Sequence, residues 1–214
     1  MRPVLAAIIM VLPVAAPYPI SAGGEFVQPA FPLRVAPDAD HLEDAAGRPF
    51  LIHGDTAWSL IAELTREEAE LYLSDRKKRG FNALVVSLIE YKFASKAPAN
   101  AYGERPFRKP ERFSLPNDAY FDHAEWVLRR ASDLGFLVLL APAYLGVGGG
   151  GEGWYGEMAS AGPDELKAYG QYLGQRFGEL HNILWLHGGD FDATDKNVVR
   201  AVVGGVASAG AGGL

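Results

Sequence analysis

The stretch Phe-Asn-Ala-Leu-Val-Val-Ser-Leu, residues 81–88, is the strongest indication of the architecture of this chain. It follows Gly80 and is almost continuously apolar. Residues 136–140 form a second such run, which follows Gly135. Unbroken apolar strands are typical of parallel sheets, because both faces of such sheets are covered. The two runs therefore predict parallel strands that are joined through helices in βαβ units.

Amphipathic segments alternate with these strands. Thr65-Arg66-Glu67-Glu68 has the sequence of a capping box, which begins a helix, and this helix is expected to stop at Gly80. Later segments carry apolar residues at helical spacing. The further expected elements are strands at 50–52, 136–140 and 182–186, and helices over 120–134, after Pro163 and over 198–206.

An open doubly wound sheet and a closed barrel both contain such units. The long loops after the strands favour the barrel, because loops at the carboxyl ends of barrel strands form the active site. A complete barrel takes about 250 residues, whereas this chain has 214. We therefore predict an α/β fold: a (β/α)8 TIM barrel, present only as its first four β/α units, with a short N-terminal β-hairpin lead.

The chain is expected to comprise a secretory signal peptide (1–22), a lead segment with a hairpin (23–48) and a partial, apparently truncated catalytic domain (49–214). Arg2, the apolar run at 4–16 and the small residues near Ala22 follow the order of a signal peptide. The run is too short to span a bilayer. We expect a secreted or periplasmic protein with no membrane contact after signal removal.

The composition is that of an ordinary globular protein, with 49% hydrophobic and 21% charged residues. The formal net charge is -6 and there is no basic run, which argues against a nucleic-acid partner. The chain has no cysteine, so its stability must come from packing without disulfides.

Polar and aromatic residues follow the predicted strands, where barrels keep their chemistry. Sugars bind such surfaces, because their C–H faces stack on aromatic rings while carboxylates and imidazoles bind the hydroxyls. Asp190 is the predicted catalytic carboxyl, since it follows the strand at 182–186 on a glycine turn. The predicted sugar-binding residues are His53, Asp55, Trp58, Glu90, Tyr144, Trp154 and His187.

Other interpretations of these residues stay open. Asp190 alone is as consistent with a cap of the following helix, and His53 with a partner of a main-chain carbonyl. A second hypothesis is a metal-dependent hydrolase, with His53, Asp55, His187 and Asp190 around zinc or a similar ion. A third is a non-catalytic carbohydrate-binding remnant. The glycan-hydrolysis hypothesis itself requires no cofactor and no metal.

Four segments together resemble the apiosidase-like glycoside hydrolase family: residues 50–60 (Phe-Leu-Ile-His-Gly-Asp-Thr-Ala-Trp-Ser-Leu), 79–82 (Arg-Gly-Phe-Asn), 141–146 (Ala-Pro-Ala-Tyr-Leu-Gly) and 182–191 (Asn-Ile-Leu-Trp-Leu-His-Gly-Gly-Asp-Phe). The resemblance runs from about Phe31 to about Val203. It implies a secreted bacterial (β/α)8 barrel that acts on pectin-type plant glycans and releases a terminal sugar such as apiose.

The resemblance also implies that Asp190 is the general acid/base and that a nucleophilic carboxylate follows a late barrel strand. No residue of this sequence matches that carboxylate, so we expect the chain to be inactive alone. The Ala/Gly-rich segment 204–213 suggests a truncated or frame-shifted gene product. Self-association through the open edges 50–52 and 182–186 is expected as well, with Leu84, Val86, Val138 and Leu140 on a partly uncovered inner face.

Overall fold

The computed structural model describes residues 27–37, 40–110 and 112–210. The predicted signal peptide, 1–22, lies outside the described residues. Within them, no helix is both long and apolar enough to cross a membrane.

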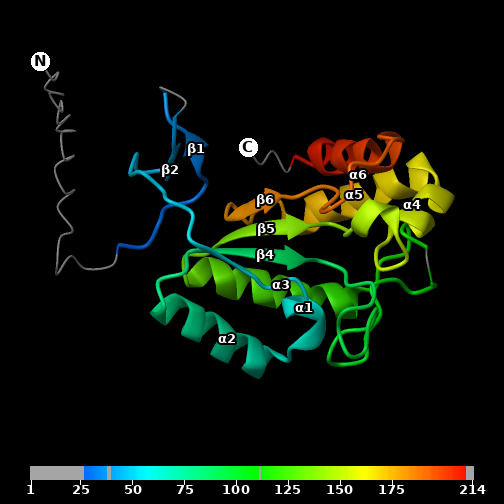
Figure 1. The fold of residues 1–214 in the computed structure, drawn as a ribbon, viewed down its shortest axis with the longest axis horizontal. Coiled ribbons are helices and arrows are strands. Elements are labelled where there is room, and N and C mark those ends of the chain that lie inside the picture. Colours follow the sequence, from blue (N-terminus) through cyan, green and yellow to red (C-terminus); the bar gives the residue numbers. More distant parts are fainter. Residues whose placement is uncertain (1–26, 38–39, 111, 211–214) are drawn as a thin grey trace, which may run out of the picture.

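Four parallel strands form the central sheet (Figure 1). The observed sheet confirms the predicted α/β class with parallel pairing. Leu84 lies opposite both Asp55 and Val138, so neighbouring strands are level with one another and end at the same edge. In sheet order the strands are β3 (Gly54–Thr56), β4 (Ala83–Ser87), β5 (Leu137–Ala141) and β6 (Ile183–Trp185).

Helices follow each of these strands and pack on the sheet (Figure 1). The predicted capping box is present: Thr65 accepts a hydrogen bond from the Glu68 main chain, and the Glu68 side chain accepts one from the Thr65 main chain. The longer helices are α2 (Arg66–Lys78), α3 (Asp118–Asp133), α5 (Pro163–Phe177) and α6 (Asn197–Ser208). Short helices are α1 (Leu60–Glu63), η1 (Val147–Gly149) and α4 (Tyr155–Ala161).

A small antiparallel hairpin precedes the sheet, formed by β1 (Arg34–Val35) and β2 (Leu42–Glu43). The buried Asp44 closes it by accepting hydrogen bonds from the main chain of Ala30, Ala46 and Arg48 and from the Arg48 guanidinium. The Arg48 guanidinium, followed by these main-chain donors, holds the pKa of Asp44 well below its usual range. A hairpin therefore precedes the sheet, with Arg34 opposite Glu43 and Val35 opposite Leu42.

The first sheet strand does not lie where the sequence predicts it. It covers Gly54–Thr56, whereas the expected strand was 50–52. The side chain of Asn82 explains the difference, because it accepts a hydrogen bond from the His53 main chain and donates one to the Leu51 carbonyl. Residues 51–53 are thus held to the sheet by the Asn82 side chain and by one main-chain hydrogen bond, from the Asn82 N–H to the His53 carbonyl, ahead of the strand itself.

The two faces of the sheet are covered differently. Leu84, Val86, Val138 and Leu140, predicted to face an open interior, are instead buried in the main core with α2, α3 and α5. The sequence could not distinguish the faces, because both are apolar in these strands. The opposite face carries Ala83, Leu137, Leu139 and Leu184, over which residues of the lead segment pack, namely Phe31, Leu33, Leu42 and Phe50.

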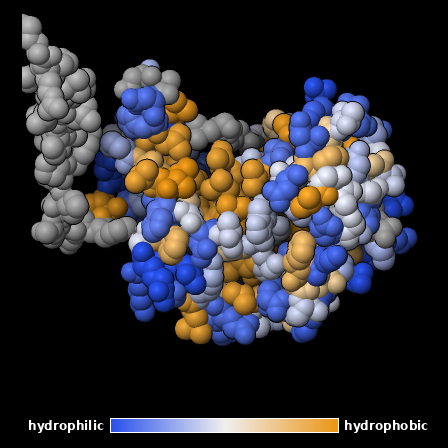
Figure 2. All heavy atoms as spheres, in the orientation of Figure 1, coloured by the Kyte–Doolittle hydropathy of each residue, from blue (hydrophilic) through white to orange (hydrophobic). Residues whose placement is uncertain are grey.

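Part of this second face remains accessible. Leu139 and Leu184 are only partly buried, and Figure 2 shows apolar side chains gathered near the middle of the view in which β4, β5 and β6 lie. Strands β3 and β6 form the edges of the sheet. Self-association through these edges stays a prediction.

Glycines set the distance between α5 and α6. A Cβ atom on Gly170 would lie 2.2 Å from the Val202 carbonyl oxygen, and one on Gly205 would lie 2.3 Å from the Lys167 carbonyl oxygen. Both distances are shorter than any van der Waals contact, so a side chain at either position would force the helices apart. The Gly-rich sequence after residue 200 is therefore explained in part by close helix packing.

Two adjacent glycines of α6 give a matched test of this contact. We expect Gly205→Ala to lower the free energy of unfolding by about 1–3 kcal/mol, because the new methyl group meets the α5 main chain. Gly204 faces open space, so Gly204→Ala is expected to raise the free energy by up to about 1 kcal/mol through helix propensity. Urea denaturation of both variants measures the difference. Equal effects would contradict the proposed packing role.

Candidate active site

A pocket of about 280 Å³ opens at the edge where the strands end. It combines two carboxylates with aromatic rings, which is the composition that the sequence predicts for a sugar site. Its lining comes from the last residue of β4 and from segments that follow β3, β4, β5 and β6. We call it the Asp190 pocket, and its lining residues are Trp58, Ser87, Glu90, Phe93, Tyr144 and Asp190.

Asp190 is exposed at the mouth of this pocket and is held by Tyr144. The Tyr144 hydroxyl donates a hydrogen bond of 3.0 Å to the Asp190 carboxylate. Burial raises the pKa of Tyr144 to about 12, and the hydrogen bond to Asp190 adds to the shift. Tyr144 therefore stays protonated near neutral pH and remains a donor to the carboxylate.

The turn before Asp190 needs its glycines. Gly188 and Gly189 have φ angles of 95° and 69°, which side chains rarely adopt. A Cβ atom on Gly189 would also lie 2.5 Å from the Tyr144 ring. Tyr144 pairs with Gly188 in an isolated parallel bridge, which extends the β5–β6 contact past the strand ends. The glycine turn thus brings Asp190 beside the tyrosine.

Glu90 lies deep in the pocket, with 2% of its surface exposed. One carboxylate oxygen accepts hydrogen bonds from the main-chain N–H groups of Tyr91, Lys92 and Phe93. The other oxygen accepts a 2.8 Å hydrogen bond from the Ser59 hydroxyl. Both oxygens are therefore used to hold the loop after β4, as buried carboxylates require.

Trp58 supplies the apolar wall of the pocket. It is half-buried, and its ring centroid lies 5.6 Å from that of Tyr144. The structure thus brings together four of the predicted residues, Trp58, Glu90, Tyr144 and Asp190. Sequence reasoning missed Ser87 and Phe93. Ser87 had a signal, as a polar residue inside an apolar strand, whereas nothing in the sequence distinguishes Phe93 within its loop.

His53 and Asp55 lie elsewhere. His53 precedes β3, at the amino end of the sheet, where its ring stacks on Phe81 at 4.4 Å and contacts the Gly80 carbonyl. Asp55 accepts a hydrogen bond from Tyr72 and forms a 3.0 Å ion pair with Arg76. Both positions follow from the displaced strand: with β3 at Gly54–Thr56, His53 lies before the strand and Asp55 lies within it, so neither residue follows the strand.

His187 and Trp154 also line other cavities. His187 borders a cavity of about 220 Å³ next to α6, and burial lowers its pKa. Trp154 is 4% exposed, and its indole N–H donates to the Ile89 carbonyl, so its ring is part of the protein core. It borders a separate cleft beside α4.

Two of the alternative interpretations can be compared with these positions. The N-cap of α6 is Lys196, and the carboxylate that accepts a hydrogen bond from the first turn, from the Asn197 main chain, belongs to Asp195 and not to Asp190. The four residues of the metal hypothesis do not converge. Across 27–37, 40–110 and 112–210, no group of three or more His, Cys, Asp or Glu residues could hold a metal ion.

Several solved structures resemble this chain. One is a glycoside hydrolase with 28% sequence identity and a TM-score of 0.70, matched over 86% of this chain and 40% of its own. Another is a glycoside hydrolase family 5 protein from Bacteroides vulgatus, with 25% identity and a TM-score of 0.68, matched over 85% and 38%. The chain therefore spans about two fifths of the length of these two structures.

A family 5 mannosidase from Rhizomucor miehei shares the fold, with 15% identity and a TM-score of 0.57 over 83% of this chain and 54% of its own. These structures are (β/α)8 glycoside hydrolases. No curated protein matches the chain. The sequence model of the apiosidase-like catalytic domain matches residues 36–213, most of the chain. The chain belongs to the apiosidase-like catalytic domain family.

Proposed function

We propose that this chain carries the sugar-binding and proton-donating part of a glycoside hydrolase that acts on plant cell-wall (pectin-type) glycans and releases a terminal sugar such as apiose. Family membership supports the reaction class. The observation that carries the proposal is the Asp190 carboxylate beside the rings of Trp58 and Tyr144, in a pocket large enough for one sugar. On sequence grounds alone, we propose that the protein is secreted or periplasmic.

In this proposal Asp190 protonates the glycosidic oxygen as the bond breaks. Glycoside hydrolysis needs such a proton donor and a second carboxylate that acts as nucleophile or base. The Tyr144 hydroxyl holds the Asp190 carboxylate at the mouth of the pocket, where a leaving group would lie. Trp58 offers an apolar face for the sugar ring.

Glu90 is the other carboxylate of the pocket, and its surroundings argue against a nucleophilic role. Four donors already bind its two oxygens. An attack on a sugar carbon would require at least one oxygen to leave these partners. We propose that Glu90 positions the loop after β4 and that the second catalytic carboxylate is a different residue.

The engaged state of Glu90 favours one alternative, a carbohydrate-binding protein without turnover. This alternative keeps the Trp58 and Tyr144 surface and differs only in the absence of a second free carboxylate. Binding and hydrolysis must therefore be measured separately.

The role of Asp190 is tested in an intact, hydrolytically active protein of the family that contains this segment. Asp190→Asn is expected to reduce sugar release from pectic oligosaccharides by about a hundred- to ten-thousandfold, the usual contribution of general acid catalysis. Binding should change little. Asp192→Asn is the matched control, because Asp192 is exposed and pairs with Lys196 outside the pocket. A near wild-type rate for Asp190→Asn on a substrate with a poor leaving group would refute the assignment.

The 214-residue chain by itself is expected to bind pectic oligosaccharides and to leave them uncleaved, because Glu90 is not free to react. Trp58→Ala is expected to weaken this binding about fivefold or more through loss of the stacking surface. Calorimetric titration and a reducing-sugar assay measure the two properties, with Trp126→Ala on α3 as control. If the chain releases sugar and Glu90→Gln abolishes that release, Glu90 is the second catalytic carboxylate. This outcome would contradict the proposal that Glu90 only positions the loop after β4.

A further inference from the structure

Ser87 is the last residue of the apolar strand β4, and it lines the Asp190 pocket. Only 3% of Ser87 is exposed, whereas Asp190 is exposed at the mouth, so Ser87 belongs to the floor of the pocket. Its side chain lies on the second face of the sheet, the face of Ala83, because alternate residues of a strand point to the same side. A serine at this buried position requires an explanation, because an apolar residue would leave no hydroxyl to satisfy.

The Ser87 hydroxyl has no partner in the part of the chain that the structure describes. Within residues 27–37, 40–110 and 112–210, no group forms a hydrogen bond with it. The residue opposite Ser87 on β5 is Ala141, whose methyl group cannot form one. The Ser87 main chain, in contrast, is bonded, because its N–H donates to the Trp58 carbonyl at 2.8 Å. The hydroxyl is not among the polar atoms that the protein encloses completely, so it is open to the pocket.

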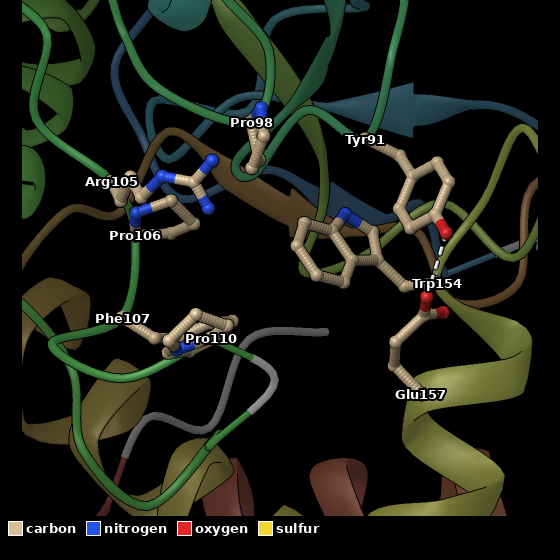
Figure 3. Close-up of a pocket in the computed structure, with 8 residues that line it drawn as sticks. All are labelled: Tyr91, Pro98, Arg105, Pro106, Phe107, Pro110, Trp154 and Glu157. Atoms are coloured by element: carbon tan, nitrogen blue, oxygen red, sulfur yellow. Dashed lines mark hydrogen bonds between the residues drawn. The ribbon is translucent and has the colours of Figure 1, made fainter.

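The neighbouring carboxylate of Glu90 is not available to this hydroxyl. Its two oxygens accept hydrogen bonds from the Ser59 hydroxyl and from three main-chain N–H groups of its own loop. The loop is also anchored on its other side, where the Tyr91 hydroxyl donates a 2.6 Å hydrogen bond to Glu157 in the cleft beside α4 (Figure 3). A movement of this loop that satisfied Ser87 would therefore break bonds that already exist.

A buried hydroxyl that is open to a pocket and bonds nothing in the protein indicates a partner in the ligand, because buried polar groups are almost always hydrogen-bonded. A sugar hydroxyl fits this partner, since it both donates and accepts, as the serine hydroxyl does. Trp58 lines the same pocket and offers the apolar contact that a sugar ring also needs. A site that bonds a particular hydroxyl discriminates against an analogue that lacks it, because its own polar group is then left unpaired.

We propose that Ser87 is a specificity-determining residue that binds one hydroxyl of the terminal sugar, on the side of the ring away from the glycosidic oxygen. In the proposed function Asp190 meets the glycosidic oxygen at the mouth of the pocket, so the floor faces the opposite side of the ring. In an apiose unit, that side carries the C3 hydroxyl and the hydroxymethyl branch on C3. The assignment to a sugar rests on the proposed function, whereas the unsatisfied Ser87 hydroxyl does not.

The probes are methyl β-apiofuranoside and three analogues that each lack one hydroxyl, at C2, at C3 or on the branch. NMR titration of the 214-residue chain is expected to show about three- to thirtyfold weaker binding of one of the two analogues altered at C3, because Ser87 is then left unpaired. Ser87→Ala should bind the parent apioside as weakly and should no longer distinguish it from that analogue. The preference for the parent over the C2 analogue should be the same in both proteins.

A second measurement on Ser87→Ala needs no ligand. Because the hydroxyl bonds nothing in the free protein, its removal is expected to leave the midpoint of urea denaturation unchanged or to raise it. Ser59→Ala is the matched control, because the Ser59 hydroxyl donates to Glu90 and its loss is expected to lower the midpoint. A purely structural role for Ser87 predicts a lower midpoint in Ser87→Ala as well.

Ser160→Ala is the control for binding, since Ser160 is exposed on α4 outside the Asp190 pocket; it should leave each affinity within about a factor of two, well below the effect of a lost hydrogen bond. Unchanged affinity and selectivity in Ser87→Ala would overturn the role of Ser87, and so would a fall in its urea midpoint as large as that of Ser59→Ala. Absence of apioside binding to the unaltered chain is a different result, which would overturn the proposed function and the role of Ser87 with it.

Discussion

The main-chain hydrogen bonds between β4 and β5 hold five residues of each strand in register, from Ala83 opposite Leu137 to Ser87 opposite Ala141. Strands β3 and β6 join this ladder from either side, so the four strands end at one edge. The Asp190 pocket and the cleft beside α4 both lie in the segments that leave this edge. A shift of one residue would exchange the two faces of a strand, and Leu84 would then leave the helix layer. Both sites depend on this register.

The sequence was sufficient for elements whose signals are local. The strands at 81–88 and 136–140, as well as the helix that Thr65 begins, carry their own apolar pattern or cap. The first strand was misplaced because Phe50 is apolar for another reason: it covers the second face of the sheet and packs on Phe31 at 6.3 Å. The His53 N–H and the Leu51 carbonyl are satisfied by the Asn82 side chain, a tertiary contact that no local pattern records.

The candidate site was predictable to the extent that one rule applies, namely that the carboxyl ends of parallel strands converge. This rule places Glu90, Tyr144 and Asp190 together, as observed. It cannot say which way a loop residue turns, and Trp154 turns into the core away from Asp190. The cleft beside α4 was beyond sequence reasoning for the same reason, because its two charged residues, Arg105 and Glu157, come from a loop and from a separate helix with no shared spacing.

The contact between Gly189 and the Tyr144 ring links Tyr144 to two adjacent residues far along the chain, Gly189 and Asp190. The Tyr144 ring occupies the space that a side chain at position 189 would need, and the Tyr144 hydroxyl holds the Asp190 carboxylate. The position of each of the three residues therefore depends on the other two. The substitutions that any one of these positions can accept are therefore restricted by the residues at the other two. A relative that gained a side chain at position 189 would need a smaller residue at 144, and its acid would lose the hydroxyl that fixes its direction.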